Sequence, residues 1–282
     1  MTLQKRVMAI NDISGIGKSS LTVALPIISA AGVQCAVIPT AVLSTQTSGF
    51  LDFTFRDLSD DMLEIARHWK KEEIHIDAIY SGYLGSLAQI NIVKSIIDLY
   101  RSEETLVLID PVLGDDGELY SMFKQEHIVG MIELCSYGDI ITPNLTEASL
   151  LLGKDFKEGV MSIAQVEEIL WELNGLGSKS VILTGVSLNE NDIGVACLDG
   201  ETGESTYFMS DRIDGIYYGT GDVFASFLMG ALMCDKSLFE ATKIAVDHTH
   251  TAIKLTHSDN TNPRMGIRFE SVLNDYWKAL NN

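Results

Sequence analysis

The chain has 282 residues, and 46% of them are hydrophobic, which is enough for one large core or for one α/β domain with insertions. Its 39 acidic and 20 basic residues give a net charge of −19. This charge argues against nucleic acids and anionic membrane surfaces as partners, because both require clustered Lys and Arg. A phosphorylated small molecule stays compatible with it, since local dipoles and a metal ion can hold such a ligand.

Neither a targeting signal nor a membrane span is predicted. Met1–Arg6 is polar, and the longest apolar stretch, Val23–Val33, is broken by Pro26 and is far shorter than the roughly 20 residues of a membrane helix. The four cysteines are scattered without a CxxC pair, which indicates free thiols in a reducing compartment. We therefore expect a cytoplasmic protein without disulfides.

Short β-branched runs alternate with helical segments along most of the chain. Strands are predicted at Val7–Ile10, Cys35–Ile38, Ala78–Tyr80, Leu106–Ile109, Ile140–Ile141 and Ser180–Thr184. Helices are predicted at Ser19–Ala31, Asp60–Glu72, Ser86–Arg101, Lys124–Ser136 and Ser162–Leu176. This alternation is typical of βαβ units, and so it predicts a mostly parallel central sheet with helices on both faces.

The pattern changes after Thr184. Ile193–Leu198 and Thr206–Met209 flank a glycine-rich turn, which predicts a β-hairpin, and two apolar helices follow at about Asp222–Met233 and Leu238–Leu255. Since no linker, low-complexity tract or internal repeat interrupts the chain, we expect a single domain over residues 1–282.

A glycine turn opens the first of these two helices. The turn reads Gly219-Thr220-Gly221-Asp222 and leads directly into the apolar run Val223–Met233. Free N–H groups at a helix start bind anions, and glycine lets the backbone approach a ligand closely. A carboxylate beside phosphate suits a general base, which takes a proton from an alcohol while the amides hold the developing charge. An ordinary core helix with an acidic first turn is the alternative.

A second glycine-rich segment follows the first predicted strand. It contains Asp12, Ser14 and the string Gly17-Lys18-Ser19. A Walker A motif requires glycine five residues before its Gly-Lys pair, where this chain has Asp12. A carboxylate there would face phosphate, so we interpret the segment as a polar substrate-binding loop rather than a P-loop.

Acidic and amide side chains follow the fourth and fifth strands. Asp110 and Asp115 come after the fourth, and Asn144 and Glu147 come after the fifth. In an open α/β sheet, ligands bind beyond the carboxyl ends of the strands, where these side chains would meet Asp222. Such a group suits Mg-dependent phosphoryl transfer. Taken separately, a loop cap at Asp110 and a helix-capping box at Asn144 and Glu147 explain these residues equally well.

An aromatic residue, Tyr83, follows the third strand in the string Ser81-Gly-Tyr83. Its ring could stack on a planar heterocycle, or it could be an ordinary packed tyrosine. The histidines form no metal-ligand pairs at helical or loop spacing, and no serine or cysteine nucleophile motif is present.

Together these residues identify a resemblance to the ribokinase superfamily over nearly the whole chain, and most closely to its pyridoxal/pyridoxamine kinases. The matching pieces are Ser81-Gly-Tyr83, Asp110–Asp115, Tyr120, Thr142–Glu147, Thr184 and Gly219–Asp222. The resemblance implies an ATP-dependent kinase that phosphorylates the 5′-hydroxymethyl group of vitamin B6 on a ribokinase-like three-layer α/β/α fold. It also implies Mg²⁺, often a monovalent cation such as K⁺, and a homodimer.

The resemblance also implies roles for individual residues. Asp222 resembles the catalytic base, and Gly219, Thr220 and Gly221 resemble the anion hole. The residues that resemble substrate-pocket positions are Asp12, Ser14, Thr45, Thr47 and Tyr83. Those that resemble ATP-binding positions are Asp110, Asp115, Tyr120, Asn144, Glu147 and Thr184, with Asp110 and Glu147 also as metal ligands.

One departure leaves the substrate open. The first loop, with Asp12 and Ser14, is more similar to the loop of hydroxymethylpyrimidine kinases than to that of many pyridoxal kinases. A hydroxymethylpyrimidine kinase of thiamine biosynthesis is therefore the alternative enzyme. A catalytically silent nucleotide-binding regulator is the alternative of another class, but it would have no need of Asp222.

Overall fold

The computed structural model describes residues 4–157, 159–259 and 261–281. Its main sheet contains β1 (Arg6–Ser14), β2 (Gln34–Leu43), β3 (Phe55–Asp57), β4 (Ala78–Ser81), β5 (Leu106–Ile109), β8 (Ile140–Ile141), β9 (Ser180–Val186), β10 (Asp192–Asp199) and β11 (Glu204–Asp211). A two-stranded ribbon pairs β6 (Gly114–Asp115) with β7 (Glu118–Leu119).

The helices are α1 (Leu21–Ala30), α2 (Ser59–Lys71), α3 (Leu87–Tyr100), α4 (Gln125–Cys135), α5 (Leu145–Leu152), α6 (Ile163–Asn174), α7 (Thr220–Met233), α8 (Leu238–Ser258) and α9 (Leu273–Asn281). Polar side chains begin several of them. Ser86, Asn144, Ser162 and Ser237 each accept a hydrogen bond from the backbone N–H three residues on, which satisfies a donor that the helix leaves free.

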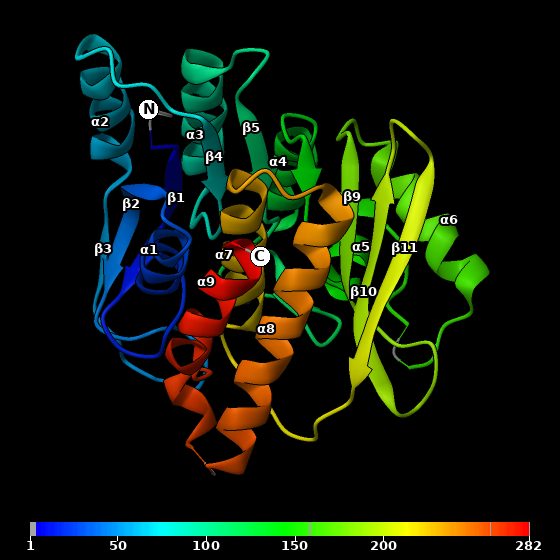
Figure 1. The fold of residues 1–282 in the computed structure, drawn as a ribbon. Helices are drawn as coiled ribbons and strands as arrows, with labels where there is room; N and C mark the ends of the chain where they lie inside the picture. Colours follow the sequence, from blue (N-terminus) through cyan, green and yellow to red (C-terminus); the bar gives the residue numbers. More distant parts are fainter. Residues whose placement is uncertain (1–3, 158, 260, 282) are drawn as a thin grey trace.

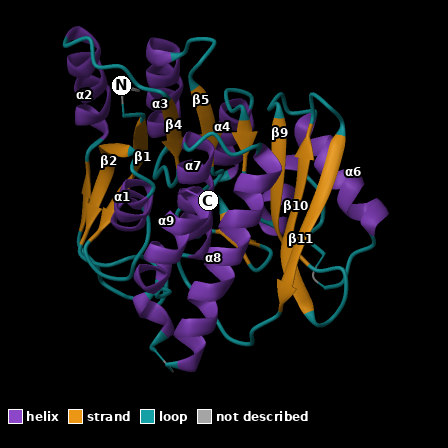
Figure 2. Ribbon diagram, viewed as in Figure 1, coloured by secondary structure: helices purple, strands orange, loops and turns teal. Residues whose placement is uncertain are grey.

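The nine strands of the main sheet lie in the order β11-β10-β9-β8-β5-β4-β1-β2-β3. The strands from β2 to β9 across this sheet pair in parallel, whereas β3, β10 and β11 pair antiparallel at its two edges. Figures 1 and 2 show α1, α7, α8 and α9 in front of the sheet and α3 to α6 behind it. The predicted three-layer α/β fold, including the late hairpin β10–β11, is confirmed.

Each face of the sheet has its own apolar core. Val7, Ala9 and Tyr80 point to the layer that contains α1, α7, α8 and α9. Met8, Ile10 and Ile79 point to the layer of α2 to α6. Because successive strand residues alternate between faces, a strand covered on both sides is a continuous apolar run, as the first and third predicted strands are.

Several predicted boundaries were wrong. β1 continues four residues past Ile10 to Ser14, so Asp12 and Ser14 lie in a strand and not in a loop. β2 extends to Leu43, and β9 extends two residues past Thr184. The short elements β3, β6, β7 and α9 were not predicted.

Other features agree with the sequence. Cys35, Cys135, Cys197 and Cys234 are free thiols, as expected. In the part of the chain that the structure describes, every helix is too short or too polar to cross a lipid bilayer.

Candidate active site

The predicted site residues gather at one edge of the sheet, where the parallel strands end. Asp12 and Ser14 end β1, Tyr83 follows β4, and Asp110 follows β5. Chain order reverses at β1, which pairs with β2 on one side and β4 on the other. Ligands of open α/β sheets bind at such a switch point. The helix α7, which carries Asp222, begins here, because Asn11 of β1 contacts the Asp222 carboxylate.

The turn before α7 is shaped by a close backbone contact. Gly219 caps the helix at a positive φ of 78°, and a Cβ on it would lie 2.3 Å from the carbonyl oxygen of Lys18. Only glycine fits there, but its space belongs to the neighbouring loop and not to an anion. A Cβ on Gly221 would meet nothing within 4 Å. Gly219 is therefore required by the neighbouring loop, whereas Gly221 faces open space at the start of α7.

The Asp222 carboxylate lies in the first turn of α7 in a polar but unpaired setting. Asn11 Nδ2 donates to its Oδ1 at 3.3 Å. Burial raises the pKa of Asp222 to about 6, the negative charge of Asp12 adds to that rise, and hydrogen bonds from the Ser20 backbone and Asn11 oppose it. A base with a pKa near 6 is mostly ionised at neutral pH and still accepts a proton readily.

Asp12 is a buried carboxylate held by two serines. Ser20 Oγ donates to its Oδ1 at 2.6 Å and Ser14 Oγ donates to its Oδ2 at 2.9 Å, and the side chain is 4% exposed. Burial raises the pKa of Asp12, although both serine hydrogen bonds lower it. Ser14 thus supports Asp12 instead of facing the site independently.

Asp110 is the second unpaired carboxylate at the strand ends. Thr142 Oγ1 donates to its Oδ1 at 3.1 Å. Burial raises the pKa of Asp110 to about 7, and the nearby charge of Asp222 adds to the rise. A buried carboxylate whose pKa is raised in this way lacks a positively charged partner. The metal ion of a metal–triphosphate complex would supply one.

Glu147 and Asn144 form the capping box that the sequence left open as their alternative role. Glu147 Oε2 accepts from the Asn144 N–H at 2.8 Å, and Asn144 Oδ1 accepts from the Glu147 N–H at 2.8 Å. Glu147 Oε1 also accepts from the Leu113 N–H at 3.1 Å, so this side chain binds the loop after β5 to the start of α5. Burial and the charge of Asp110 raise its pKa well above the ordinary value.

The carboxylates do not form a complete metal cage. No group of three or more His, Cys, Asp or Glu side chains able to hold a metal occurs among residues 4–157, 159–259 and 261–281. Mg²⁺ needs only one or two protein carboxylates when substrate phosphates and water complete its octahedron. Asp110 and Glu147 therefore fit an ion that also takes ligands from a nucleotide.

The remaining predicted ATP-binding residues surround this pair. The Tyr120 hydroxyl has its pKa raised by burial and then by Glu147, Asp115, Asp222 and Asp110, so it lies among all four. Asp115 lies exposed in the ribbon β6–β7. Thr184 forms a backbone bridge with Asn144.

The predicted substrate residues differ in their contacts and burial. The Tyr83 ring stacks on Phe123 with centroids 5.8 Å apart, and its pKa is raised by burial and by Asp12. Thr45 is half-buried, and its Oγ1 is a buried hydroxyl without a hydrogen-bond partner among the described residues. Thr47, by contrast, is exposed. Tyr83 and Thr45 suit a pocket for a polar heterocycle.

The side chain of Lys18 points away from this site. Its Nζ lies 2.9 Å from Glu270 Oε2 and 5.8 Å from the centroid of the Phe269 ring. A P-loop lysine would face the β- and γ-phosphates instead. This geometry agrees with the interpretation that Gly17-Lys18-Ser19 is not a P-loop.

We expect Lys18→Ala to change kcat and the KM for ATP by no more than several-fold. The Lys18 and Glu270 side chains are 31% and 52% exposed, and an exposed ion pair contributes about 0–1 kcal/mol. Steady-state kinetics with ATP varied, together with circular dichroism, would measure this. A loss of orders of magnitude in a folded variant would show that ATP binds at the loop after β1.

Three further residues were not predicted to contribute to the site. Asn11 is fully buried and bonds to Asp222. Gln46, 5% exposed, donates to the Arg264 carbonyl at 2.8 Å, and Arg264 Nη1 donates to the Gly49 carbonyl at 3.2 Å. These contacts bind the Thr45–Phe50 loop to the C-terminal segment. Only the polarity of Asn11 within an otherwise apolar strand was a signal in the sequence.

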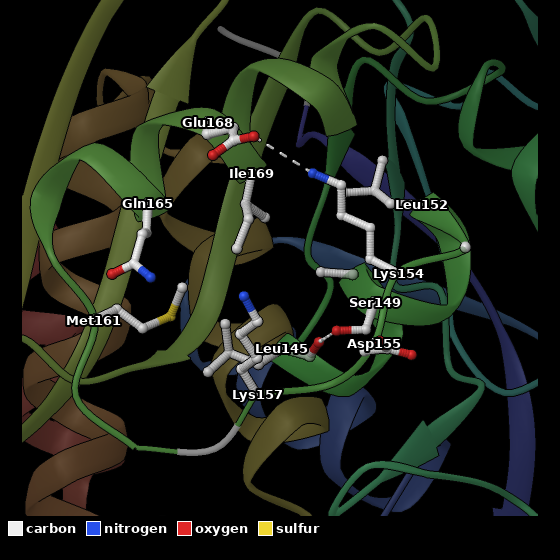
Figure 3. A pocket seen from close by; sticks show the side chains of 12 residues that line it. Leu145, Ser149, Leu152, Lys154, Asp155, Lys157, Met161, Gln165, Glu168 and Ile169 are labelled. Atoms are coloured by element: carbon white, nitrogen blue, oxygen red, sulfur yellow. Dashed lines mark hydrogen bonds and ion pairs between the residues drawn. The ribbon is translucent and has the colours of Figure 1, made fainter.

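A separate cavity of about 500 Å³ opens between α5 and α6 (Figure 3). None of the predicted site residues lines it. Lys154 on its rim pairs with Glu172 at 2.5 Å and with Glu168 at 3.7 Å, so its charge is already compensated. Its lining begins at Leu145, the first residue of the helix that Asn144 caps.

Comparison with known proteins agrees with this geometry. Residues 24–267 match the family model described as phosphomethylpyrimidine kinase. The chain belongs to this family. The phosphomethylpyrimidine kinase family thus covers most of the chain, and the predicted kinase class is confirmed.

Two solved structures are similar over nearly the full length. One is a Bacteroides thetaiotaomicron protein named as a phosphomethylpyrimidine kinase and crystallised with pyridoxal, with 38% identity, a TM-score of 0.92, and coverage of 97% of this chain and 96% of that one. The other is a Lactobacillus plantarum pyridoxal kinase, with 33% identity, a TM-score of 0.89, and coverage of 99% and 98%. The predicted resemblance to pyridoxal kinases is confirmed.

A curated relative has the alternative activity in its name. The hydroxymethylpyrimidine/phosphomethylpyrimidine kinase of Aquifex aeolicus is 31% identical over 176 residues, which cover 61% of this chain and 66% of the relative. The chain spans between 64% and 67% of the length of the first curated relatives it matches.

Proposed function

We propose that this member of the phosphomethylpyrimidine kinase family transfers the γ-phosphate of ATP to the 5′-hydroxymethyl group of a vitamin B6 vitamer, in pyridoxal 5′-phosphate salvage. The observation that carries the proposal is the Asp222 carboxylate, which lies in the first turn of α7 without a cationic partner and has a pKa of about 6. The similarity to a pyridoxal kinase and to a structure with pyridoxal supports the choice of substrate.

In the proposed reaction, Asp222 accepts the proton of the substrate alcohol. The alcohol oxygen forms a bond to the γ-phosphorus as the bond from that phosphorus to the ADP oxygen breaks. The backbone amides at the start of α7, after Gly219, stabilise the charge on the transferring group. Asp110 and Glu147 would hold a Mg²⁺ ion that comes with the nucleotide, and the ion would offset the negative charge of the phosphates.

The other ligand contacts follow from where the groups lie. Asn144, Thr184, Asp115 and Tyr120 flank the Asp110 side and are proposed to bind the nucleotide. Tyr83, Thr45 and Thr47 are proposed to bind the heterocycle. Asp12, supported by Ser14, is proposed to meet the ring nitrogen or the phenol of that heterocycle.

Phosphorylation of hydroxymethylpyrimidine is the second candidate. The similarity to the Aquifex aeolicus enzyme favours it, and a buried Asp12 would suit either heterocycle. Turnover should be measured with pyridoxal, pyridoxamine, pyridoxine and hydroxymethylpyrimidine, with ATP and Mg²⁺ in each case. A kcat/KM for hydroxymethylpyrimidine above that of every B6 vitamer would replace the proposed substrate, and absence of turnover with all four would contradict the function.

We also propose, on the sequence pattern, that residues 1–282 form a single kinase domain in a cytoplasmic protein. On the resemblance alone, we propose that the protein is a homodimer and that K⁺ stimulates it. Light scattering of the purified protein and turnover in KCl against tetramethylammonium chloride would test the dimer and the cation requirement. A monomer with full turnover in tetramethylammonium chloride would contradict both.

We expect Tyr83→Ala to raise the KM for the B6 vitamer about tenfold or more and to change the KM for ATP little. Stacking of a planar base on an aromatic ring contributes about 1–3 kcal/mol in comparable sites. One face of the Tyr83 ring packs on Phe123, which leaves the other face for a ligand. Steady-state kinetics with each substrate varied in turn would measure the effect.

Phe123→Leu is the matched control for packing, because it removes the stacked partner of Tyr83 and leaves the tyrosine itself. If the KM for ATP rose in Tyr83→Ala instead, the two halves of the site would be exchanged. If neither KM changed, Tyr83 would be a packed tyrosine and the heterocycle would bind elsewhere.

A further inference from the structure

Asn11 is a fully buried polar residue in the middle of the central sheet. It lies on β1, between the apolar run Val7–Ile10 and Asp12, and its exposed fraction is 0%. A buried amide is costly unless its donors and acceptors are satisfied. Asn11 therefore requires an explanation that the apolar packing of β1 does not provide.

The hydrogen bonds of Asn11 fix which way its side-chain amide faces. Oδ1 accepts from the Tyr83 N–H at 2.9 Å and from the Asp12 N–H at 3.0 Å. Backbone N–H groups are donors only, so the oxygen must face them. The Nδ2 group then faces the Asp222 Oδ1 at 3.3 Å, where a donor meets a carboxylate. A flipped amide would oppose donor to donor and acceptor to acceptor.

The backbone at Gly82 lies close against the Asn11 side chain. A Cβ on Gly82 would lie 2.1 Å from Asn11 Nδ2. The pairing of β1 with β2 shifts in register between Asn11 and Ile13, and the irregular strand turns the Asn11 and Asp12 side chains to the site. The Asn11 amide thus contacts both Tyr83, which belongs to the proposed substrate pocket, and Asp222, the proposed base.

We propose that Asn11 is a positioning residue that fixes the Asp222 carboxylate relative to the heterocycle pocket, by donating to Asp222 while it accepts from the backbone of Tyr83. This inference rests on the proposed function, in which Asp222 is the base. The groups that shift the pKa of the Asp222 carboxyl are Asp12, the Ser20 backbone and Asn11. The charge of Asp222 in turn raises the pKa values of Asp110, Tyr120 and Tyr80. None of these side chains is cationic, so an amide provides the orienting donor.

The experiment separates the two functions of Asn11 by substitution. Asn11→Ala removes both, whereas Asn11→Asp keeps an acceptor oxygen for Tyr83 and Asp12 and removes the amide donor to Asp222. Displacement of a catalytic group by about 1 Å costs up to about 10²-fold. We expect both variants to lose at least tenfold in kcat, with the KM for ATP unchanged. The Kd for pyridoxal, measured by tryptophan fluorescence, should weaken in Asn11→Ala and stay within about threefold in Asn11→Asp.

A double-mutant cycle tests whether Asn11 acts through Asp222. If it does, Asn11→Ala should cause little further loss of kcat in an Asp222→Asn background, since residues that act as a unit are not additive. If the kcat losses of Asn11→Ala and Asp222→Asn multiplied in the double variant, the proposal would be overturned. Wild-type kcat in both Asn11→Ala and Asn11→Asp, together with a lowered kcat in Asp222→Asn, would also overturn it.

Controls keep folding and function apart. Asn174→Ala removes a comparable side-chain hydrogen bond, 2.7 Å from its Nδ2 to the Ser178 carbonyl, far from the site, and should keep wild-type kinetics. If Asn11→Ala does not fold, Gly82→Ala, which pushes the Asn11 amide aside, should reproduce its loss of kcat; wild-type kcat in folded Gly82→Ala would overturn the proposal. If the protein phosphorylated hydroxymethylpyrimidine only, the proposed substrate would change, but the role of Asn11 could be tested in the same way with that substrate. If it phosphorylated none of the alcohols, both the proposed function and the proposed role of Asn11 would be overturned.

Discussion

Asp222→Asn should lower kcat by about 10²–10⁴-fold and leave the KM for ATP within a few-fold of wild type. Loss of a general base has this magnitude. Asparagine keeps the shape of the side chain and an oxygen that Asn11 Nδ2 can bond to, but it cannot accept the proton of the alcohol. The amides at the start of α7 are unchanged, so nucleotide binding should persist.

The pH dependence provides a second check on Asp222. Its carboxyl has a pKa of about 6, so at lower pH it is protonated and cannot act as a base. We therefore expect wild-type kcat/KM for the vitamer to fall as pH decreases through about 6, and Asp222→Asn to lose the part of this fall that Asp222 causes. Protonation of Asp110, which has a pKa of about 7, should still lower the residual activity of the variant. Asp247→Asn, an exposed carboxylate paired with Lys243 on α8, is the matched control. Asp222→Asn turnover within a few-fold of wild type would remove the assignment.

The fold could be predicted because the apolar pattern changes period along the chain. Runs such as Val7–Ile10 and Leu106–Ile109 are apolar throughout, because the middle strands of a parallel sheet are covered on both faces. The prediction failed at the short strands β3, β6 and β7, whereas the equally short β8, Ile140–Ile141, was predicted because both of its residues are β-branched and apolar. Such elements contain too few positions for any period to emerge.

The end of β1 shows why strand boundaries are difficult to predict. Polarity at Asn11 and Asp12 indicated a loop, since an unpaired polar group inside a sheet is costly. In the structure, Ser20 and Ser14 satisfy Asp12, and Tyr83 and Asp222 satisfy Asn11. The partner Asp222 lies 211 positions away along the chain, and no local pattern contains it.

The candidate site also has features that the sequence predicts and features that it does not. Residues at strand ends, such as Asp110 and Asn144, could be proposed because parallel strands end at one edge. The function of each one there depends on contacts that only the fold creates. Glu147 caps α5 and holds the Leu113 amide, and Gly219 is glycine because the Lys18 carbonyl lies against it. The spacing of Asn144 and Glu147 predicted the capping box, which the structure confirms, whereas their role in a nucleotide site was inferred from their place at the strand ends and stays a prediction.

Asp110→Asn should stabilise the ligand-free protein at pH 8 and at the same time lower kcat/KM for Mg-ATP by about 10–100-fold. Loss of a group that orients a metal has about this effect on activity. The stabilisation should be about 1–2 kcal/mol, because the change removes a buried carboxylate without a cationic partner and keeps an oxygen for the Thr142 hydroxyl. Active sites commonly sacrifice stability for function in this way.

The pH dependence of stability distinguishes this cause from a general change in packing. The pKa of Asp110 is raised from 3.8 to about 7 on folding. Between these values the folded state holds a proton that the unfolded state has lost, so the free energy of unfolding decreases as pH rises from about 4 to about 7. Asp110→Asn removes that contribution, so urea unfolding at pH 5 and pH 8 should differ less in the variant than in the wild type. Asp116→Asn, an exposed carboxylate in the following ribbon, is the control and should keep the wild-type difference. An Asp110→Asn variant with the wild-type difference between the two pH values, or with lower stability at pH 8, would show that Asp110 is compensated by a partner in the folded chain.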